Sequence, residues 1–180
     1  KGVMPGDERL IGGGGWNKNH IGGEVFNFKD FGGHLYGYIE AKGSIALEKI
    51  DLLARDDESL EHVVVIFVAP RAGGGQVVVG WYSDAQVSRY PVRWAGRAKG
   101  AAGKGVGSAG KLYYLKATAK HAVLLPLHMR TFDGVPTGKG GMGQANVCYR
   151  YYNAEGDEKD ERWIEEALSY VINYDGPNLL

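Results

Sequence analysis

The chain has 180 residues, of which 44% are hydrophobic and 23% are charged, as is usual for a single globular domain. No apolar run approaches the roughly 20 residues that a membrane helix needs. Cys148 is the only cysteine, which excludes disulfides within the chain and cysteine-built zinc sites. We therefore expect a reducing, cytoplasmic location.

The net charge is zero, but the charges are unevenly distributed. No acidic residue occurs between Asp84 and Asp133, and this interval is rich in arginine and lysine. The acidic residues gather near the C-terminus instead. A local basic surface is what contact with nucleic-acid phosphates requires, although a solvated, lysine-rich loop has the same composition.

The first part of the chain predicts an arm followed by two strands. Residues 1–15 end in four consecutive glycines and predict a flexible N-terminal arm, so residues 16–180 are expected to form one domain. Residues 24–29 alternate polar and apolar side chains, as half-buried strands do. A glycine turn then leads to a predicted partner strand over residues 34–40.

The centre of the chain predicts an antiparallel hairpin. Two valine-rich runs, residues 62–70 and 76–87, are joined by a short glycine-rich segment. Gly80 lies in the second run, where glycine often marks a bulge or a close approach by a ligand. Trp81 and Tyr82 should point to opposite faces. One of them is expected in the core, and the other is free to form a pocket wall.

The segments beside this hairpin are predicted as a helix, a loop and a strand. Ser44 is placed to cap a short helix over residues 45–53. Pro91 is expected to interrupt the second strand of the hairpin. Residues 92–111 then form a long basic loop rich in Gly and Ala, of a length that is often functional or disordered. Residues 112–119 resume as a strand.

The last third of the chain completes the predicted fold. Residues 122–126 form a buried connection, residues 133–143 a glycine-rich loop and residues 144–152 a strand. Residues 157–174 have helical spacing, with Trp163 on the apolar side. The elements together predict an α+β fold: a small, mostly antiparallel, partly closed β-barrel of six or seven strands with flanking helices.

Catalytic motifs are not evident in the sequence. None of the five histidines has zinc-ligand spacing, and no serine lies in Gly-x-Ser-x-Gly. Cys148 lies in a predicted strand, where cysteine is usually an inert core residue. The run Asp56-Asp57-Glu58 is expected to be a solvated loop. The sequence therefore favours a binding domain without a metal or cofactor over an enzyme.

Aromatic side chains near basic ones favour nucleic-acid binding. An extruded base is held between stacking rings, and a few polar groups recognise its edge. Asp84 can accept a hydrogen bond from an exocyclic amine, or it can equally well form a turn or an ion pair. The base-pocket candidates are Trp16, Asn17, Tyr36, Trp81, Tyr82, Asp84 and Trp94. The phosphate-contact candidates are Arg89, Arg93, Arg97, Lys99, Lys104 and Lys111.

Several short segments resemble an N-terminal domain that precedes HNH nuclease modules in bacterial proteins. These segments are residues 15–17, 24–28, 36–38, 78–87, 124–126 and 143–147. The order of the predicted strands is also similar to the EVE/YTH branch of PUA-like folds. In that branch, a strand that ends in Val-Gly-aromatic lines an aromatic cage for a modified base. The resemblance covers most of residues 15–150.

The resemblance implies the specificity domain of a modification-dependent restriction endonuclease. Its partner would be double-stranded DNA that carries 5-methylcytosine, 5-hydroxymethylcytosine or N6-methyladenine, flipped into a cage of Trp16, Trp81 and Trp94. The chain has no HNH motif, so cleavage would belong to a fused or associated nuclease module beyond Leu180. A modified-RNA reader and a small-molecule or peptide binding module are the alternatives, and an enzyme fragment such as a glycosylase or nuclease comes third.

Overall fold

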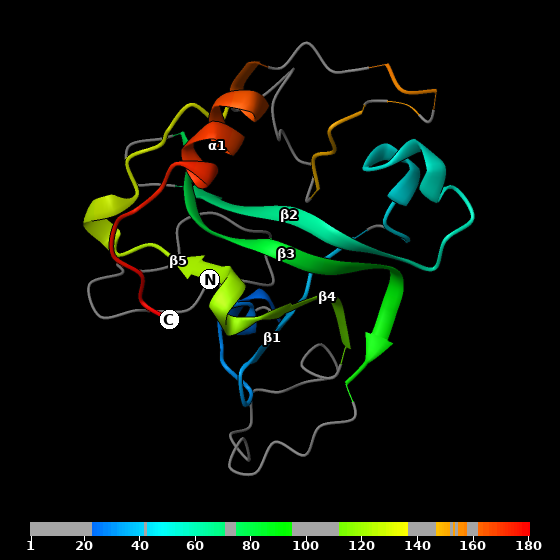
Figure 1. The fold of residues 1–180 in the computed structure, drawn as a ribbon, viewed down its shortest axis with the longest axis horizontal. Coiled ribbons are helices and arrows are strands. Elements are labelled where there is room, and N and C mark those ends of the chain that lie inside the picture. Colours follow the sequence, from blue (N-terminus) through cyan, green and yellow to red (C-terminus); the bar gives the residue numbers. More distant parts are fainter. Residues whose placement is uncertain are drawn as a thin grey trace.

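The structure is a computed structural model that describes residues 23–41, 43–70, 75–94, 112–136, 147–151, 153, 155–157 and 162–180. These residues form an α+β fold in which a five-stranded antiparallel sheet is flanked by short helices (Figure 1). The strands are β1 (His34–Gly37), β2 (Ser59–Pro70), β3 (Gln76–Arg93), β4 (Leu112–Thr118) and β5 (Ala122–Leu124). The helices are α1 (Arg162–Ile172) and the 3-10 turns η2 (Gly23–Phe26), η3 (Leu47–Lys49), η4 (Leu52–Ala54), η6 (Ala119–His121) and η7 (Leu127–Met129).

The central hairpin is present as predicted. Strands β2 and β3 pair antiparallel from Pro70 opposite Gln76 to Ser59 opposite Ser88. Long valine runs favour this extended, paired backbone. The register shifts at three places along the pair, so the hairpin is bulged, and each bulge redirects the side chains that follow it.

The sheet is an open path among the described strands. Its order is β1-β4-β3-β2, and β5 pairs with β3 beside this path. Within the described residues, β1 and β2 are not paired with each other, and five strands are found where six or seven were predicted. The antiparallel α+β class is therefore confirmed, and closure into a barrel is not.

Strand β3 continues through Pro91, so the prediction that this proline interrupts the strand is wrong. Val87 pairs with Leu115, and the next pair is Val92 with Tyr113. Residues 88–91 of β3 therefore oppose a single residue of β4. Proline has no N–H to give to a ladder, and inside this irregularity none is needed.

Gly80 marks both a bulge and a close approach, but the approaching group is the protein itself. Gly80 pairs with Phe67 on β2 and with Leu124 on β5. A Cβ at this position would collide with the backbone carbonyl oxygen of Val123 and would lie 2.7 Å from Cζ of Phe28. The missing side chain is thus explained by the packing of β5 against β3.

Trp81 and Tyr82 lie on opposite faces of β3 and are both buried. Tyr82 is fully buried in a core with Leu35 and Leu115, whereas Trp81 is only 3% exposed and packs in a second core beneath α1. The ring of Tyr174 lies 5.1 Å from that of Trp81, edge to face. The prediction that one of the two forms an open pocket wall is therefore wrong, because α1 covers the face that Trp81 occupies.

The predicted strand over residues 24–29 is instead the 3-10 turn η2 followed by a turn. Side-chain hydrogen bonds replace strand pairing here. Nδ2 of Asn27 donates to the carbonyl of Tyr38 at 3.1 Å, and the N–H of Tyr38 donates to Oδ1 of Asn27 at 2.8 Å. One buried amide therefore fixes the two segments without a ladder.

The predicted helix over residues 45–53 is split into η3 and η4. Asp51 begins η4 and accepts the N–H of Leu53 on its side chain at 3.0 Å. Asp at such a position favours a new helix start. Ser44 caps neither turn, since η3 begins after Ala46. Leu53 is 91% exposed and is not part of the core.

The C-terminal predictions are confirmed in part. Helix α1 covers residues 162–172 of the predicted 157–174; Asp157 lies outside the helix, and Trp163 packs against the second core. Residues 147–150 form no strand, because Tyr149 and Tyr151 are bonded to η3 and its flank instead. Residues 1–15, 95–111 and 137–143 lie outside the described part. In the described part, no helix is long and apolar enough to cross a membrane.

Candidate functional site

One face of the sheet carries polar and aromatic side chains that are partly exposed. We call it the outer face; it consists of His34, Tyr36, Asp84, Gln86, Lys116 and Thr118. Tyr36 and Gln86 both pair with Lys116, and His34 pairs with Thr118. The alternate residues, such as Leu35, Ala85 and Ala117, are buried on the opposite face, as the two-residue period of a strand requires.

Aromatic rings gather at one side of the outer face. We call this group the aromatic cluster; it comprises Phe31, His34, Tyr36, Trp94 and Tyr113, all partly exposed. Tyr36 is central, with ring centroids 5.0 Å from Tyr113 and 5.6 Å from Trp94. Trp94 is also 4.7 Å from Phe31. These separations are typical of attractive ring pairs.

Three elements deliver these rings to one place. Tyr36 comes from β1 and Tyr113 from β4, and Trp94 is the first residue after β3. The turn before β1 is held by the N–H of Gly33, which donates to Oδ1 of Asp30 at 2.6 Å. Burial, followed by the neighbouring Tyr36 hydroxyl, raises the pKa of Tyr113, so its phenol is neutral at physiological pH.

Basic side chains adjoin the aromatic cluster. Nζ of Lys29 lies 5.4 Å from the centre of the Phe31 ring, within cation–π range. Arg93 directly precedes Trp94 and is exposed at the end of β3. Lys116 is the cross-strand neighbour of Tyr36. The cluster therefore presents stacking rings next to positive charge.

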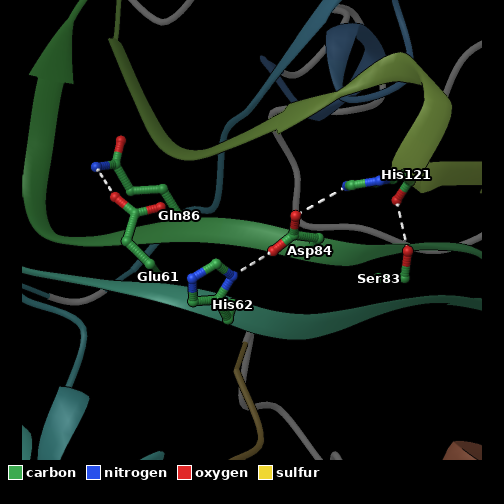
Figure 2. Close-up of polar contacts among 6 residues, drawn as sticks. All are labelled: Glu61, His62, Ser83, Asp84, Gln86 and His121. Carbon is green, nitrogen blue, oxygen red and sulfur yellow. Dashed lines mark hydrogen bonds and ion pairs between the residues drawn. The ribbon is translucent and has the colours of Figure 1, made fainter.

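Asp84 is held between two histidines (Figure 2). Nδ1 of His62 lies 2.8 Å from Oδ1 of Asp84, and Nδ1 of His121 lies 2.9 Å from Oδ2. The hydrogen bond from His62, together with that from His121, holds the pKa of the Asp84 carboxyl below its usual value. Both carboxylate oxygens are thus engaged by histidine nitrogens, and the contacts are ion pairs when the imidazoles are protonated.

Arg89 does not face solvent as a phosphate contact. Its Nε donates to the carbonyl of Asp57 at 2.8 Å, and its Nη2 donates to those of Ala54 and Arg55 at 2.8 and 2.7 Å. Its Nη1 lies 3.0 Å from Oε2 of Glu48, and only 14% of the side chain is exposed. The prediction that Arg89 binds phosphate is therefore wrong, since these partners use its guanidinium.

No protein-family model, curated protein or solved structure matches this chain. The chemistry of the site must therefore follow from its own side chains. Within the described residues, no group of three or more His, Cys, Asp or Glu is placed to hold a metal ion. What the outer face offers instead is a set of partly exposed rings, flanking cations and one carboxylate–imidazole cluster.

The structure brings together only some of the predicted site residues. Tyr36 and Trp94 meet in the aromatic cluster, and Arg93 is the exposed residue before Trp94. Six predicted residues lie outside the described part, namely Trp16, Asn17, Arg97, Lys99, Lys104 and Lys111. Phe31, Tyr113, His62 and His121 also lie at this face and were not predicted as site residues from the sequence. Strand alternation from Lys116 would place Tyr114 rather than Tyr113 on this face, because the register shift between Val87 and Val92 breaks the two-residue period. The histidines come from distant segments with no shared motif.

Proposed function

We propose that this domain binds nucleic acid at the aromatic cluster and recognises a modified base there. The observation that carries the proposal is the position of Tyr36, whose ring lies 5.0 Å from Tyr113 and 5.6 Å from Trp94 on a partly exposed sheet face. Aromatic rings on such a face stack nucleobases, and each stacked base contributes about 1–3 kcal/mol.

The charges around the cluster support a polyanionic partner. Lys29 and Lys116 adjoin the rings, and Arg93 precedes Trp94 in a chain that continues into a stretch with no acidic residue before Asp133. In the proposal, Arg97, Lys99, Lys104 and Lys111 add phosphate contacts from that stretch. Such contacts release counterions and make the affinity depend on salt.

The proposal moves the base-binding site away from Trp81. That indole is sealed beneath α1, whereas Trp94 is partly exposed. A PUA-like, partly closed barrel and a cytoplasmic location remain parts of the same proposal. The domain itself is a binding module, and cleavage of the modified DNA would belong to a fused or associated nuclease module.

A binding panel tests the proposal. Labelled DNA duplexes that differ in one base, either unmodified or carrying 5-methylcytosine, 5-hydroxymethylcytosine or N6-methyladenine, are titrated at two salt concentrations, with an RNA arm. We expect one modified duplex to bind at least about tenfold more tightly than the unmodified one. Tyr36→Ala and Trp94→Ala should each weaken that binding by about tenfold or more.

Tyr90→Ala is the matched control. Tyr90 also lies on β3 and is 55% exposed, but it does not belong to the aromatic cluster, so its removal should leave affinity unchanged. Equal affinity for all duplexes would exclude the recognition of a modified base. Tighter binding of modified RNA would favour the RNA alternative, and an absence of any salt-dependent binding would leave the small-molecule or peptide module.

A further inference from the structure

The Asp84 cluster shares the outer face with the aromatic cluster. We use the name Asp84 cluster for Asp84, His62 and His121. Asp84 lies two residues before Gln86 on β3, and Gln86 is joined through Lys116 to Tyr36. Strand spacing of about 4.8 Å and a rise of about 3.4 Å per residue separate the backbones of Asp84 and Tyr36 by about 12 Å. A nucleic-acid strand with one base stacked on Tyr36 can therefore extend over Asp84.

Two bulges aim the side chains of this cluster at each other. Leu60 pairs with Val87 and Val63 with Ala85, so residues 61–62 oppose one residue of β3. The next shift, from Val63 to Val65 on β2, places residues 83–84 opposite one residue of β2. Bulges of this kind re-aim side chains and are frequent at functional sites.

His62 also has an unusual backbone conformation. Its φ is +59°, and it is the only residue other than glycine with a positive φ in the described part of the chain. A histidine here is strained relative to glycine, and its side chain is 87% exposed. The protein thus holds an exposed imidazole in a costly conformation, in contact with Asp84, although burial gains nothing from it.

The hydrogen bonds leave one nitrogen of each imidazole away from Asp84. Both histidines contact the carboxylate through Nδ1, from opposite sides (Figure 2). A neutral imidazole that donates through Nδ1 has only an acceptor at Nε2, whereas a protonated one has a second donor there. The charge of the Asp84 cluster changes from −1 with both histidines neutral to +1 with both protonated.

The surrounding charges do not override this change. Glu61 on β2 accepts a hydrogen bond from Gln86 Nε2 at 2.5 Å. Lys116 on β4 pairs with Gln86, and Lys120 directly precedes His121 in η6. His34 and Tyr36 on β1 are the other titratable groups of the outer face. The segments that pack around the Asp84 cluster thus contribute one carboxylate and two lysines, and the two imidazoles are the groups whose protonation changes the charge of the cluster.

We infer that the Asp84 cluster is a proton-dependent phosphate site, in which Nε2–H of His62 or His121 contacts a phosphodiester of the strand whose base lies in the aromatic cluster. This inference rests on the proposed function. Only a protonated imidazole has an N–H at Nε2 while Nδ1–H contacts Asp84, and a charge-assisted contact to phosphate is among the stronger hydrogen bonds. Affinity should therefore be higher in acidic solution, where the imidazoles are protonated, than in alkaline solution.

The test measures the affinity of a labelled duplex with one modified base between pH 5.5 and pH 8. The wild type should bind about tenfold more tightly at pH 5.5 than at pH 8. The double variant His62→Asn, His121→Asn should lose this difference. Asparagine keeps an N–H for Asp84 in the place of Nδ1 and tolerates a positive φ, so the fold is retained. His128→Asn in η7 is the matched control and should retain the difference in affinity between pH 5.5 and pH 8.

Asp84→Asn separates phosphate binding from a purely structural role. Without the carboxylate charge, the duplex should bind more tightly than to the wild type at pH 8, whereas a structural clamp predicts weaker or unchanged binding. Affinity that is independent of pH in the wild type would overturn this inference and leave the proposed function standing. Loss of the pH difference in His128→Asn would also overturn it, and no binding at any pH would overturn both.

Discussion

The guanidinium of Arg89 and the carboxylate of Glu48 form an ion pair, with 3.0 Å between Nη1 and Oε2. This ion pair joins the C-terminal half of β3 to η3. Three backbone carbonyls share the same guanidinium. Arg89→Ala should lower the free energy of unfolding by about 3 kcal/mol, because it leaves a half-buried carboxylate and these carbonyls without their donor. Urea denaturation at pH 7 measures this change, and an effect below about 0.5 kcal/mol would show that the network is dispensable.

Arg93 should behave in the opposite way. It is exposed at the end of β3, so Arg93→Ala should change the free energy of unfolding by less than about 0.5 kcal/mol. In the proposed complex it contacts a phosphate, and its removal should reduce the slope of log affinity against log salt by about 1. Titrations of one labelled duplex at several salt concentrations give this slope. A slope equal to that of the wild type would remove Arg93 from the interface.

Substitutions of Trp81, in β3, and of Trp94, directly after β3, should have different effects: the first on stability and the second on binding. Trp81→Ala should destabilise the fold by about 4 kcal/mol, because it opens a cavity between β3 and α1. Trp94→Ala should have a much smaller effect on stability and a larger effect on duplex affinity. Thermal melting and binding are measured on both variants. If Trp94→Ala melts as early as Trp81→Ala, its ring serves the core rather than a ligand.

Gly80→Ala should be strongly destabilising for a change of one methyl group. The new Cβ would meet a backbone oxygen of β5 and the Phe28 ring, and a backbone group cannot rotate away as a side chain does. We expect a loss of about 2–3 kcal/mol. Gly134→Ala is the comparison, because its nearest neighbour is the far end of the Phe132 ring at 3.2 Å. Equal stability of the two variants by urea denaturation would contradict the close approach of β5.

Stability should fall in alkaline solution because of Tyr82. Burial raises the pKa of Tyr82, and its hydroxyl donates to the carbonyl of Asn27. A raised pKa means that the folded protein keeps this proton more firmly than the unfolded chain does. The stabilisation is therefore complete below about pH 10, the pKa of an unfolded tyrosine, and is lost as the pH rises above it.

Tyr82→Phe tests this dependence on pH. Loss of the hydrogen bond should lower the free energy of unfolding of the variant by about 1 kcal/mol at pH 7. Between pH 9 and pH 11, this free energy should fall less steeply in the variant than in the wild type. Tyr90→Phe, at an exposed position of β3, should keep the slope of the wild type. Urea denaturation across this range gives both slopes, and parallel curves for Tyr82→Phe and the wild type would assign the alkaline loss to other groups.

Local pattern was sufficient for the elements whose stability is local. The valine-rich runs and the glycine-rich segment between them predict the β2–β3 hairpin. Burial alternates along β1 and over residues 115–118 of β4, but Tyr114 and Leu115 are both buried, so the alternation does not extend along the whole of β4. The same alternation places Tyr36 on a partly exposed face. Alternation failed over residues 24–29, because a single amide of Asn27 satisfies the backbone that a strand partner would otherwise have paired.

The amino-acid sequence by itself determined the antiparallel class, the central hairpin and the aromatic and basic character of the segments around it, since these follow from composition and short-range period. Only the tertiary structure decided which tryptophan is covered, which carboxylate takes Arg89, and that His62 and His121 meet at Asp84. The reason is separation along the chain: Arg89 and Glu48 lie 41 residues apart, and His121 and Asp84 lie 37 apart. Contacts over such distances depend on register and on bulges, and one shifted residue turns a side chain to the other face.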